Sequence, residues 1–185
     1  MNEEQNPWRI TGQREVYSNP WIQLTEYDVI NPGGGKGIYG KVSFKNIAVG
    51  VIPLDENYNT WIIGQYRFPT DTYSWEIPEG GGARDETTLE AAQRELLEEA
   101  GLKALRWDKL LEMHLSNSVT DETSVVYIAR ELSQHTAHPE ETESLVVKKL
   151  PFTKVVDMVM KEEIKDAISV AAILKLNYLI ERKLI

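Results

Sequence analysis

The sequence predicts an α/β fold in which helices cover both faces of a mixed sheet, preceded by a small antiparallel sheet. Short runs rich in β-branched and aromatic residues recur through the first part of the chain and return in its second half. One helical pattern with defined ends lies between the two groups of strands, and two further helical patterns follow the last of them. This order of strands and helices is typical of an α/β/α sandwich.

The first 45 residues are expected to form the small antiparallel sheet. Its expected strands are residues 8–16, 21–29 and 38–44. The run Asn31-Pro32-Gly33-Gly34-Gly35, which precedes the third strand, is a strong turn signal. We therefore divide the chain into an N-terminal β element, residues 1–45, and a main domain, residues 46–185.

The main domain is expected to contain six strands and three helices. The strands are expected at residues 46–54, 60–67, 73–77, 107–114, 124–131 and 145–150. The helices are expected between Thr87 and Gly101, at residues 152–161 and at residues 166–182. The polar segment 133–143, which contains histidines and a proline, is expected to be a loop.

The first of these helices has clear signals at both ends. Thr87 followed three residues later by Glu90 fits a capping box, in which each residue satisfies a backbone or side-chain group of the other. Gly101 can end the helix in the left-handed conformation. The sequence therefore predicts a short helix with fixed ends, opened by a glycine turn at Gly80.

Three glutamates lie together on this helix. Glu95, Glu98 and Glu99 are neighbours on one face, because side chains three and four residues apart lie side by side. Such carboxylates repel one another unless a cation lies among them, and ligand sets made only of oxygen favour Mg²⁺ or Mn²⁺. A run of glutamates is more often a solvated face, but here Arg94 and glycines accompany it at fixed offsets.

Composition limits the other classes of function. The net charge of −9 argues against broad binding to nucleic-acid phosphates. Without cysteine the chain has no disulfides, thiol catalysis or Cys-ligated zinc. No apolar run approaches the roughly 18 residues that a membrane helix needs, and the polar start is not a signal peptide. We therefore expect a cytoplasmic protein with no membrane or nucleic-acid partner.

The spacing of charged and glycine residues around the helix is specific. It is Gly80-x5-Glu86-x7-Arg94-Glu95-Leu96-x-Glu98-Glu99-x-Gly101-Leu102. This pattern resembles the Nudix hydrolase signature at every defined position, and the resemblance covers residues 46–185. It implies a Nudix-type α/β/α sandwich that hydrolyses a nucleoside diphosphate linked to another moiety. It also implies Mg²⁺ as cofactor, with Mn²⁺ as a substitute.

Matching the signature residue by residue implies a set of metal ligands. They are Glu95 and Glu99, then Glu98, and the backbone carbonyl of Glu79. Glu98 is also a candidate catalytic residue. Arg94 is expected to orient Glu98 or to pair with Glu86 or Glu90 rather than to touch substrate.

The general base is expected on the loop that follows. In similar sugar-nucleotide hydrolases a loop glutamate activates water, and this loop offers Glu140, then Glu141, with Glu143 third. His138 is a further alternative.

Three residues are expected to contact the substrate. Arg67, in Gln65-Tyr66-Arg67, resembles an arginine that reaches phosphate, although a strand-end arginine can also be a plain surface residue. Glu76, in Trp75-Glu76-Ile77-Pro78, is expected to touch substrate or help to coordinate metal. Glu122 is expected either to bind ligand or metal across a dimer or to serve as an ordinary turn residue.

The specificity is expected to differ from that of strict ADP-ribose hydrolases. Those relatives tend to carry a proline after the signature, whereas Ser116 to Glu122 contains none. We therefore expect hydrolysis of a nucleoside diphosphate sugar, such as GDP-mannose or an ADP-sugar, to a nucleoside monophosphate and a sugar 1-phosphate. The alternatives are an ADP-ribose pyrophosphatase and, from another class, a non-catalytic nucleotide-sensing protein.

The N-terminal sheet also resembles that of ADP-ribose pyrophosphatases. The resemblance implies a homodimer built through this sheet, which in such relatives is often exchanged between subunits. The alternative is a sheet that caps the core of its own subunit.

Overall fold

The chain forms two compact units. The structure, a computed structural model, describes residues 5–83, 85–138 and 144–185. The first unit comprises Met1–Asn46 and Ser116–Glu122, and the second comprises Ile47–Leu115 and Thr123–Ile185. A short stretch from the second half of the sequence is therefore part of the N-terminal unit.

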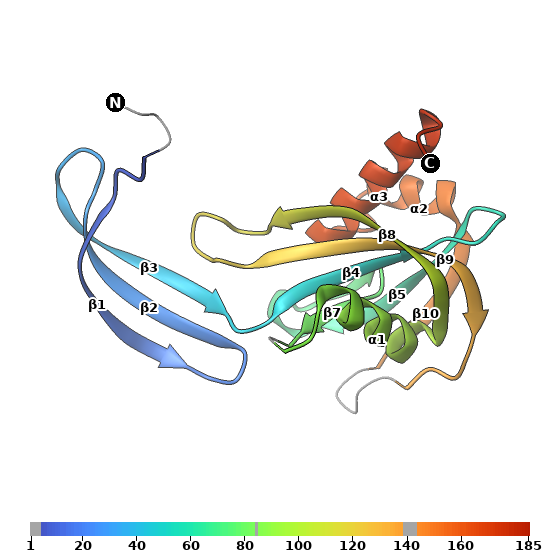
Figure 1. The fold of residues 1–185 in the computed structure, drawn as a ribbon, viewed down its shortest axis with the longest axis horizontal. Helices are drawn as coiled ribbons and strands as arrows, with labels where there is room; N and C mark the ends of the chain where they lie inside the picture. The colour runs from blue at the N-terminus through green and yellow to red at the C-terminus, as the bar shows by residue number, and fades with distance from the viewer. Residues whose placement is uncertain (1–4, 84, 139–143) are drawn as a thin grey trace. The chain divides into compact units, whose positions relative to one another are not determined.

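The first unit is built on a three-stranded antiparallel sheet of order β1-β2-β3 (Figure 1). Its strands are β1 (Arg9–Ser18), β2 (Ile22–Ile30) and β3 (Lys36–Phe44). In the turn before β3, the side chain of Asn31 accepts a hydrogen bond from the Gly35 N–H at 3.0 Å. Thr120 forms a parallel bridge with Val42, which joins Ser116–Glu122 to this sheet.

The second unit contains two sheets and three α-helices. One sheet has the order β7-β4-β9-β8 and is made of β4 (Ile47–Pro53), β7 (Glu79–Gly82), β8 (Leu102–His114) and β9 (Thr123–Gln134). The other has the order β10-β5-β6 and is made of β5 (Asn59–Arg67), β6 (Thr72–Glu76) and β10 (Val146–Pro151). The helices are α1 (Thr88–Ala100), α2 (Phe152–Met160) and α3 (Ala167–Glu181), with a short 3₁₀ turn η1 (Phe68–Thr70) after β5. Since β4 and β9 run parallel and the other pairs antiparallel, the first of these sheets is mixed.

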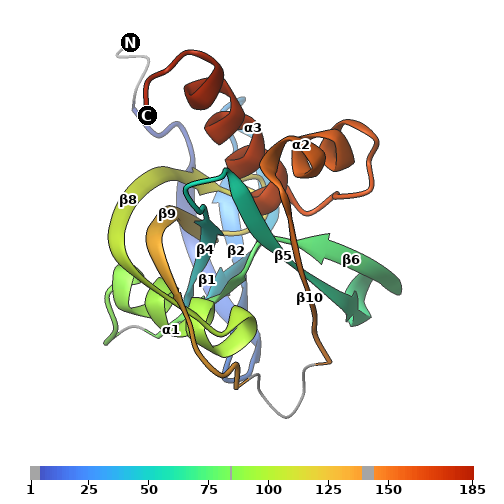
Figure 2. The ribbon, with the colours of Figure 1, turned by 90° about the vertical axis from the view of Figure 1, so that its right-hand side faces the viewer.

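Side chains of β4 point alternately to two helical layers. Val49 and Val51 pack in a cluster with Leu96 of α1. Ile52 packs in a second cluster with residues of α2 and α3, including Ile173. Alternate residues of a strand face opposite sides of a sheet, so helices cover both faces, as Figure 2 shows for α1 on one side and α2 and α3 on the other. The predicted α/β/α sandwich is confirmed.

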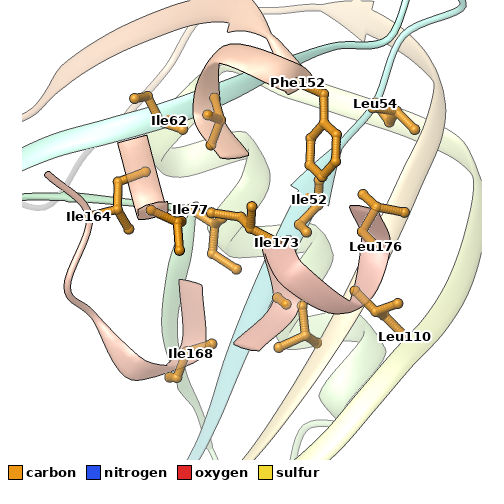
Figure 3. Close-up of a cluster of buried hydrophobic side chains, with 14 of the residues drawn as sticks. Ile52, Leu54, Ile62, Ile77, Leu110, Phe152, Ile164, Ile168, Ile173 and Leu176 are labelled. Carbon is orange, nitrogen blue, oxygen red and sulfur yellow. The ribbon is translucent and has the colours of Figure 1, made fainter. Parts of the chain in front are cut away.

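The larger cluster forms the core beneath α2 and α3 (Figure 3). It includes Ile52, Leu54, Ile62, Ile77, Leu110, Phe152, Ile164, Ile168, Ile173 and Leu176. The buried residues of α3 are Ile168, Ser169, Ala172, Ile173 and Leu176. They recur with a helical period, so one face of α3 lies against the sheets.

Three elements differ from the sequence expectation. β9 runs to Gln134, so the first two residues of the expected loop 133–143 belong to a strand. The prediction of a glycine turn at Gly80 is wrong, because Glu79–Gly82 forms strand β7, which pairs with β4. Its glycines allow close packing instead: a Cβ on Gly82 would lie 3.0 Å from the Cβ of Ala91 in α1. β8 begins at Leu102, directly after α1, rather than at residue 107. Among the described residues, no helix is long and apolar enough to cross a membrane.

Candidate active site

Helix α1 has the predicted ends. The Thr87 hydroxyl accepts the Glu90 N–H at 3.2 Å, and the Glu90 carboxylate accepts the Thr87 N–H at 2.9 Å. The Thr87 hydroxyl also donates to the Glu90 carboxylate at 2.6 Å, and the hydrogen bonds that this carboxylate accepts from the Thr87 hydroxyl and N–H lower the pKa of Glu90. Gly101 ends the helix with a φ of 63°, a left-handed conformation that favours glycine. Because both ends are fixed, the direction of each side chain on α1 is fixed too.

Arg94 ties α1 to the segments that precede it. Its Nε and Nη2 donate to the two oxygens of Glu86, both at 3.2 Å, and Nη2 also donates to the Gly81 carbonyl at 3.0 Å. Its Nη1 donates to Glu95 at 2.7 Å and to Glu98 at 2.9 Å. A guanidinium has five N–H donors, and these five bonds use them all. The pKa of Arg94 is raised, mainly by the hydrogen bond to Glu86.

Two of the expected pairings of Arg94 are therefore present. It pairs with Glu86 and orients Glu98, as the sequence suggested, and it pairs with Glu95 in addition. Glu90 is occupied by the helix cap instead.

Arg94→Lys is expected to lower both stability and turnover, because an ammonium cannot span the acceptors that the guanidinium bridges. We expect a loss of about 1–2 kcal/mol in the free energy of unfolding, which is modest because the side chain is partly exposed. Thermal unfolding and initial rates measure the two effects. Arg14→Lys is the matched control, since Arg14 pairs with Glu26 at the surface. Equal, small effects of both substitutions would contradict the bridging role of Arg94.

Glu95 and Glu99 lie against the start of β7. A Cβ on Gly80 would be 2.2 Å from the carboxyl carbon of Glu95, so this carboxylate lies directly on the glycine. Glu99 is 2% exposed, and its carboxylate accepts the Glu79 N–H at 2.9 Å. The fold thus brings Glu95, Glu99 and the backbone of Glu79 together, three groups that the sequence placed at a metal.

A second charged cluster surrounds Arg67. Its Nε donates to both oxygens of Glu76, at 2.9 and 3.1 Å, and its Nη2 donates to Glu76 at 2.5 Å and to Glu79 at 2.9 Å. Glu76 is only 2% exposed, and buried carboxylates need such partners. Burial lowers the pKa of Arg67, but Glu76 and Glu79 raise it more. Two residues that the sequence assigned separately to substrate are thus bound to each other.

The Glu79 carboxylate is a second nearly buried acid of this cluster, with a side chain that is 10% exposed. Its Oε2 is buried and has no hydrogen-bond partner among the described residues. Burial, followed by the negative charges of Asp166 and Glu76, raises the pKa of Glu79 well above its usual value. No local sequence pattern indicates that Asp166 lies in this cluster. It is the N-cap of α3, accepting the Ser169 N–H at 2.7 Å, and only the fold brings it near Glu79.

Glu79→Gln is expected to stabilise the protein more at pH 8 than at pH 5. A carboxyl with a raised pKa binds its proton more tightly in the folded state, so its contribution to stability is lost as pH rises through that pKa. We expect the Tm to rise by about 2–4 °C at pH 8 and by less at pH 5, measured by calorimetry. Glu56→Gln, at an exposed position, is the control. The same change in Tm at both pH values would contradict the burial of an ionisable Glu79.

The remaining predicted residues are only partly placed. Glu140, Glu141 and Glu143 lie outside the described residues. The N–H of His138 donates to the carbonyl of Glu98 at 2.9 Å, so the chain returns to the end of α1 just before them. Glu122 belongs to the first unit, where its N–H donates to the Thr120 hydroxyl at 3.4 Å.

The donors around α1 fit a hard cation in kind. Glu95, Glu98 and Glu99 offer only carboxylate oxygens, which Mg²⁺ prefers. Glu79 adds a buried oxygen that has no hydrogen-bond partner within the described part of the chain. In the described part of the chain, no three acidic or histidine side chains are gathered closely enough to hold a metal. Arg94 binds Glu95 and Glu98 in this arrangement. A cation would therefore have to compete with Arg94 for the carboxylates of Glu95 and Glu98.

A helix with this glutamate pattern, carried on an α/β/α sandwich, defines a Nudix domain. A family model described as the NUDIX domain matches residues 44–171, well over half of the chain. The chain belongs to the Nudix family.

Several bacterial proteins are similar to this chain in sequence. The chain is 32% identical over 178 residues to an ADP-ribose pyrophosphatase of Mycobacterium tuberculosis, covering 94% of this chain and 84% of that protein. It is 28% identical over 172 residues to an ADP-ribose pyrophosphatase of Bacillus subtilis, covering 89% and 90%. A methanol dehydrogenase activator of Bacillus methanolicus is 27% identical over 161 residues, covering 86% of each chain.

A solved structure shares the fold. A crystal structure of an ADP compounds hydrolase superposes with a TM-score of 0.85 at 20% sequence identity, covering 95% of each chain. This likeness extends over nearly the whole chain and concerns the fold alone.

Proposed function

We propose that this protein hydrolyses the pyrophosphate bond of a nucleoside diphosphate joined to a sugar, with a divalent cation as cofactor. The observation that carries the proposal is the placement of Glu95 and Glu99 against Glu79 and Gly80 at the start of β7. The names of two relatives, both ADP-ribose pyrophosphatases, support the same reaction class.

Four residues would hold Mg²⁺ or Mn²⁺ in this proposal. They are Glu95, Glu98, Glu99 and, through its carbonyl, Glu79. The bound cation would neutralise phosphate oxygens and lower the pKa of a water molecule. Arg94 holds Glu95 and Glu98 on the same side of α1, because both accept hydrogen bonds from one nitrogen of its guanidinium.

The proton of the attacking water would pass to a loop glutamate. We assign this role to Glu140 first and Glu141 second. In support, His138 binds the carbonyl of Glu98, so the last described residue before this loop lies at the end of the glutamate helix. Glu98 is a further candidate for a catalytic role.

Arg67 and Glu76 are the proposed substrate contacts, and Glu122 is proposed to bind ligand or metal across the dimer. Arg67 uses Nε and Nη2 to bind Glu76 and Glu79. We assign its remaining nitrogen, Nη1, to a phosphate oxygen, since arginine often contacts a phosphate while other groups orient it. Glu76 would then act by holding Arg67 in place rather than by direct contact alone.

A substrate panel with Mg²⁺ tests the proposal. ADP-ribose, GDP-mannose, ADP-glucose, UDP-glucose and a nucleoside triphosphate would be compared by product release. The relatives favour ADP-ribose, whereas the absence of proline between Ser116 and Glu122 favours other sugar nucleotides. Cleavage of sugar nucleotides but not of the triphosphate supports the proposal. No turnover of any compound would contradict it and favour a nucleotide-binding role.

The proposed assembly is a homodimer formed through the N-terminal sheet. The first unit exposes several large apolar side chains, and exposed apolar patches of this kind often mark interaction surfaces. They include Trp8, Ile10, Val16, Tyr17, Trp21 and Ile38. Light scattering of the wild type and of Trp21→Glu tests the proposal. A monomeric wild type would contradict it.

A further inference from the structure

The first turn of α3 is hydrogen-bonded to the segment that leads into the candidate site. Ser169 is completely buried, and its hydroxyl accepts the Ile77 N–H at 2.9 Å. The N–H of Ser169 donates in turn to the carboxylate of Asp166 at 2.7 Å. Asp166 and Ser169 thus form a short chain of hydrogen bonds that ends on the backbone between Glu76 and Glu79.

Packing holds the same two elements together. Ile77 and Ile168 are both buried in the larger core cluster (Figure 3). A Cβ on Gly50 of β4 would lie 3.0 Å from Ile77 and 3.1 Å from Ile168. Because Gly50 has no side chain, Ile77 and Ile168 can both pack directly against β4. Ser169 accepts the Ile77 N–H in the same region.

The backbone from Ile77 to Glu79 is restricted by Pro78 and by hydrogen bonds, so the position of Ile77 affects that of Glu79. Pro78 fixes its own φ and restricts the residue before it. The Pro78 carbonyl accepts the Val51 N–H at 2.8 Å, which ties the segment to β4. The next residue, Glu79, donates its N–H to Glu99. A shift of the Ile77 amide would therefore move the backbone that Glu99 binds.

Ile77, whose N–H binds Ser169, lies in sequence between two parts of the candidate site, Glu76 and Glu79. On one side, Glu76 binds Arg67. On the other, the backbone of Glu79 binds Glu99, and Gly80 lies under Glu95. Both the arginine cluster and the glutamates of α1 therefore depend on where this segment lies.

We propose that Ser169, anchored by Asp166, is a positioning residue for the carboxylate site. It fixes the Ile77 amide so that the Glu79 backbone meets Glu99 and so that Glu76 meets Arg67. The proposal rests on the proposed function for its catalytic consequence. Helix α3 thereby takes part in the site, although it lies outside the signature sequence, which ends at Leu102.

The test compares Ser169→Ala with Leu176→Val, a control that trims the buried face of α3 two turns further on. For Ser169→Ala we expect kcat to fall about tenfold, with a smaller rise in KM because Glu76, which holds Arg67, shifts with the same segment. We expect the Kd for Mn²⁺, measured by calorimetry, to rise about fivefold. Hydrogen exchange of the Glu79 amide should be faster than in the control. Gly50→Ala, which displaces Ile77 and Ile168 from β4, should lower kcat, raise the Kd for Mn²⁺ and speed exchange of the Glu79 amide in the same way. It replaces Ser169→Ala in the test if that variant does not fold.

The outcomes separate this proposal from the proposed function. Equal kcat, Mn²⁺ affinity and Glu79 exchange in Ser169→Ala and Leu176→Val would overturn the positioning role. If the wild type turns over no substrate, the proposed function fails, and the exchange of the Glu79 amide still decides the positioning role. Faster exchange than in the control would support it, and equal exchange would overturn it.

Discussion

Glu99→Gln is expected to lower turnover by at least about 100-fold while leaving the fold intact. Glutamine removes the negative charge that a divalent cation would bind. Its amide oxygen can still accept the Glu79 N–H, which the Glu99 carboxylate accepts at 2.9 Å. The loss should therefore be confined to kcat and to metal affinity. Initial rates across a range of Mg²⁺ concentrations, with thermal unfolding in parallel, measure both.

The control for this substitution is Glu112→Gln, which removes an exposed carboxylate paired with Lys109 on β8. It should leave the rate unchanged. A folded Glu99→Gln protein with a near-normal rate would show that Glu99 is not a metal ligand. The metal would then have to be assigned to other carboxylates.

Gly80→Ala is expected to reduce turnover about 100-fold, an effect typical of a displaced catalytic group. The new methyl group would lie 2.2–2.5 Å from the carboxylate atoms of Glu95, so that carboxylate must move. Because Glu95 is a flexible side chain, it can turn aside without moving the backbone. We therefore expect the free energy of unfolding to change by less than about 1 kcal/mol. Kinetic assays and denaturant titrations of the same preparations measure the two quantities.

Gly40→Ala is the control, since no atom lies within 4 Å of a Cβ added at Gly40. Normal turnover in Gly80→Ala would show that the position of Glu95 beside β7 does not matter for the reaction. Severe unfolding would show that Glu95 cannot turn aside.

The sequence predicted the α1 helix and its charged partners well, because these depend on short spacings. A capping box, a glycine cap and side chains three or four residues apart are properties of one helix. Arg94 and Glu98 are such a pair. The α/β/α layers were also predictable, because the strand and helix patterns alternate along the chain.

Contacts between distant segments could not be predicted in this way. Glycine is common both in turns and at close approaches, so the sequence alone favours a turn at Gly80. It lies in β7, where the space left by its missing side chain holds Glu95. Asp166 carries no local signal beyond a helix cap. Arg67 and Glu76 were each assigned to substrate, whereas their pairing depends on the register of β5 with β6.

The hydrogen bond from Ile77 to Ser169 spans 92 residues of sequence, and this separation has a consequence for biosynthesis. A ribosome makes the glutamate helix well before it makes α3, and contacts between distant segments form only after both have emerged. Nascent chains that end before Ser169 would carry the entire signature without this hydrogen bond. Full activity would therefore arise late in translation, when α3 docks.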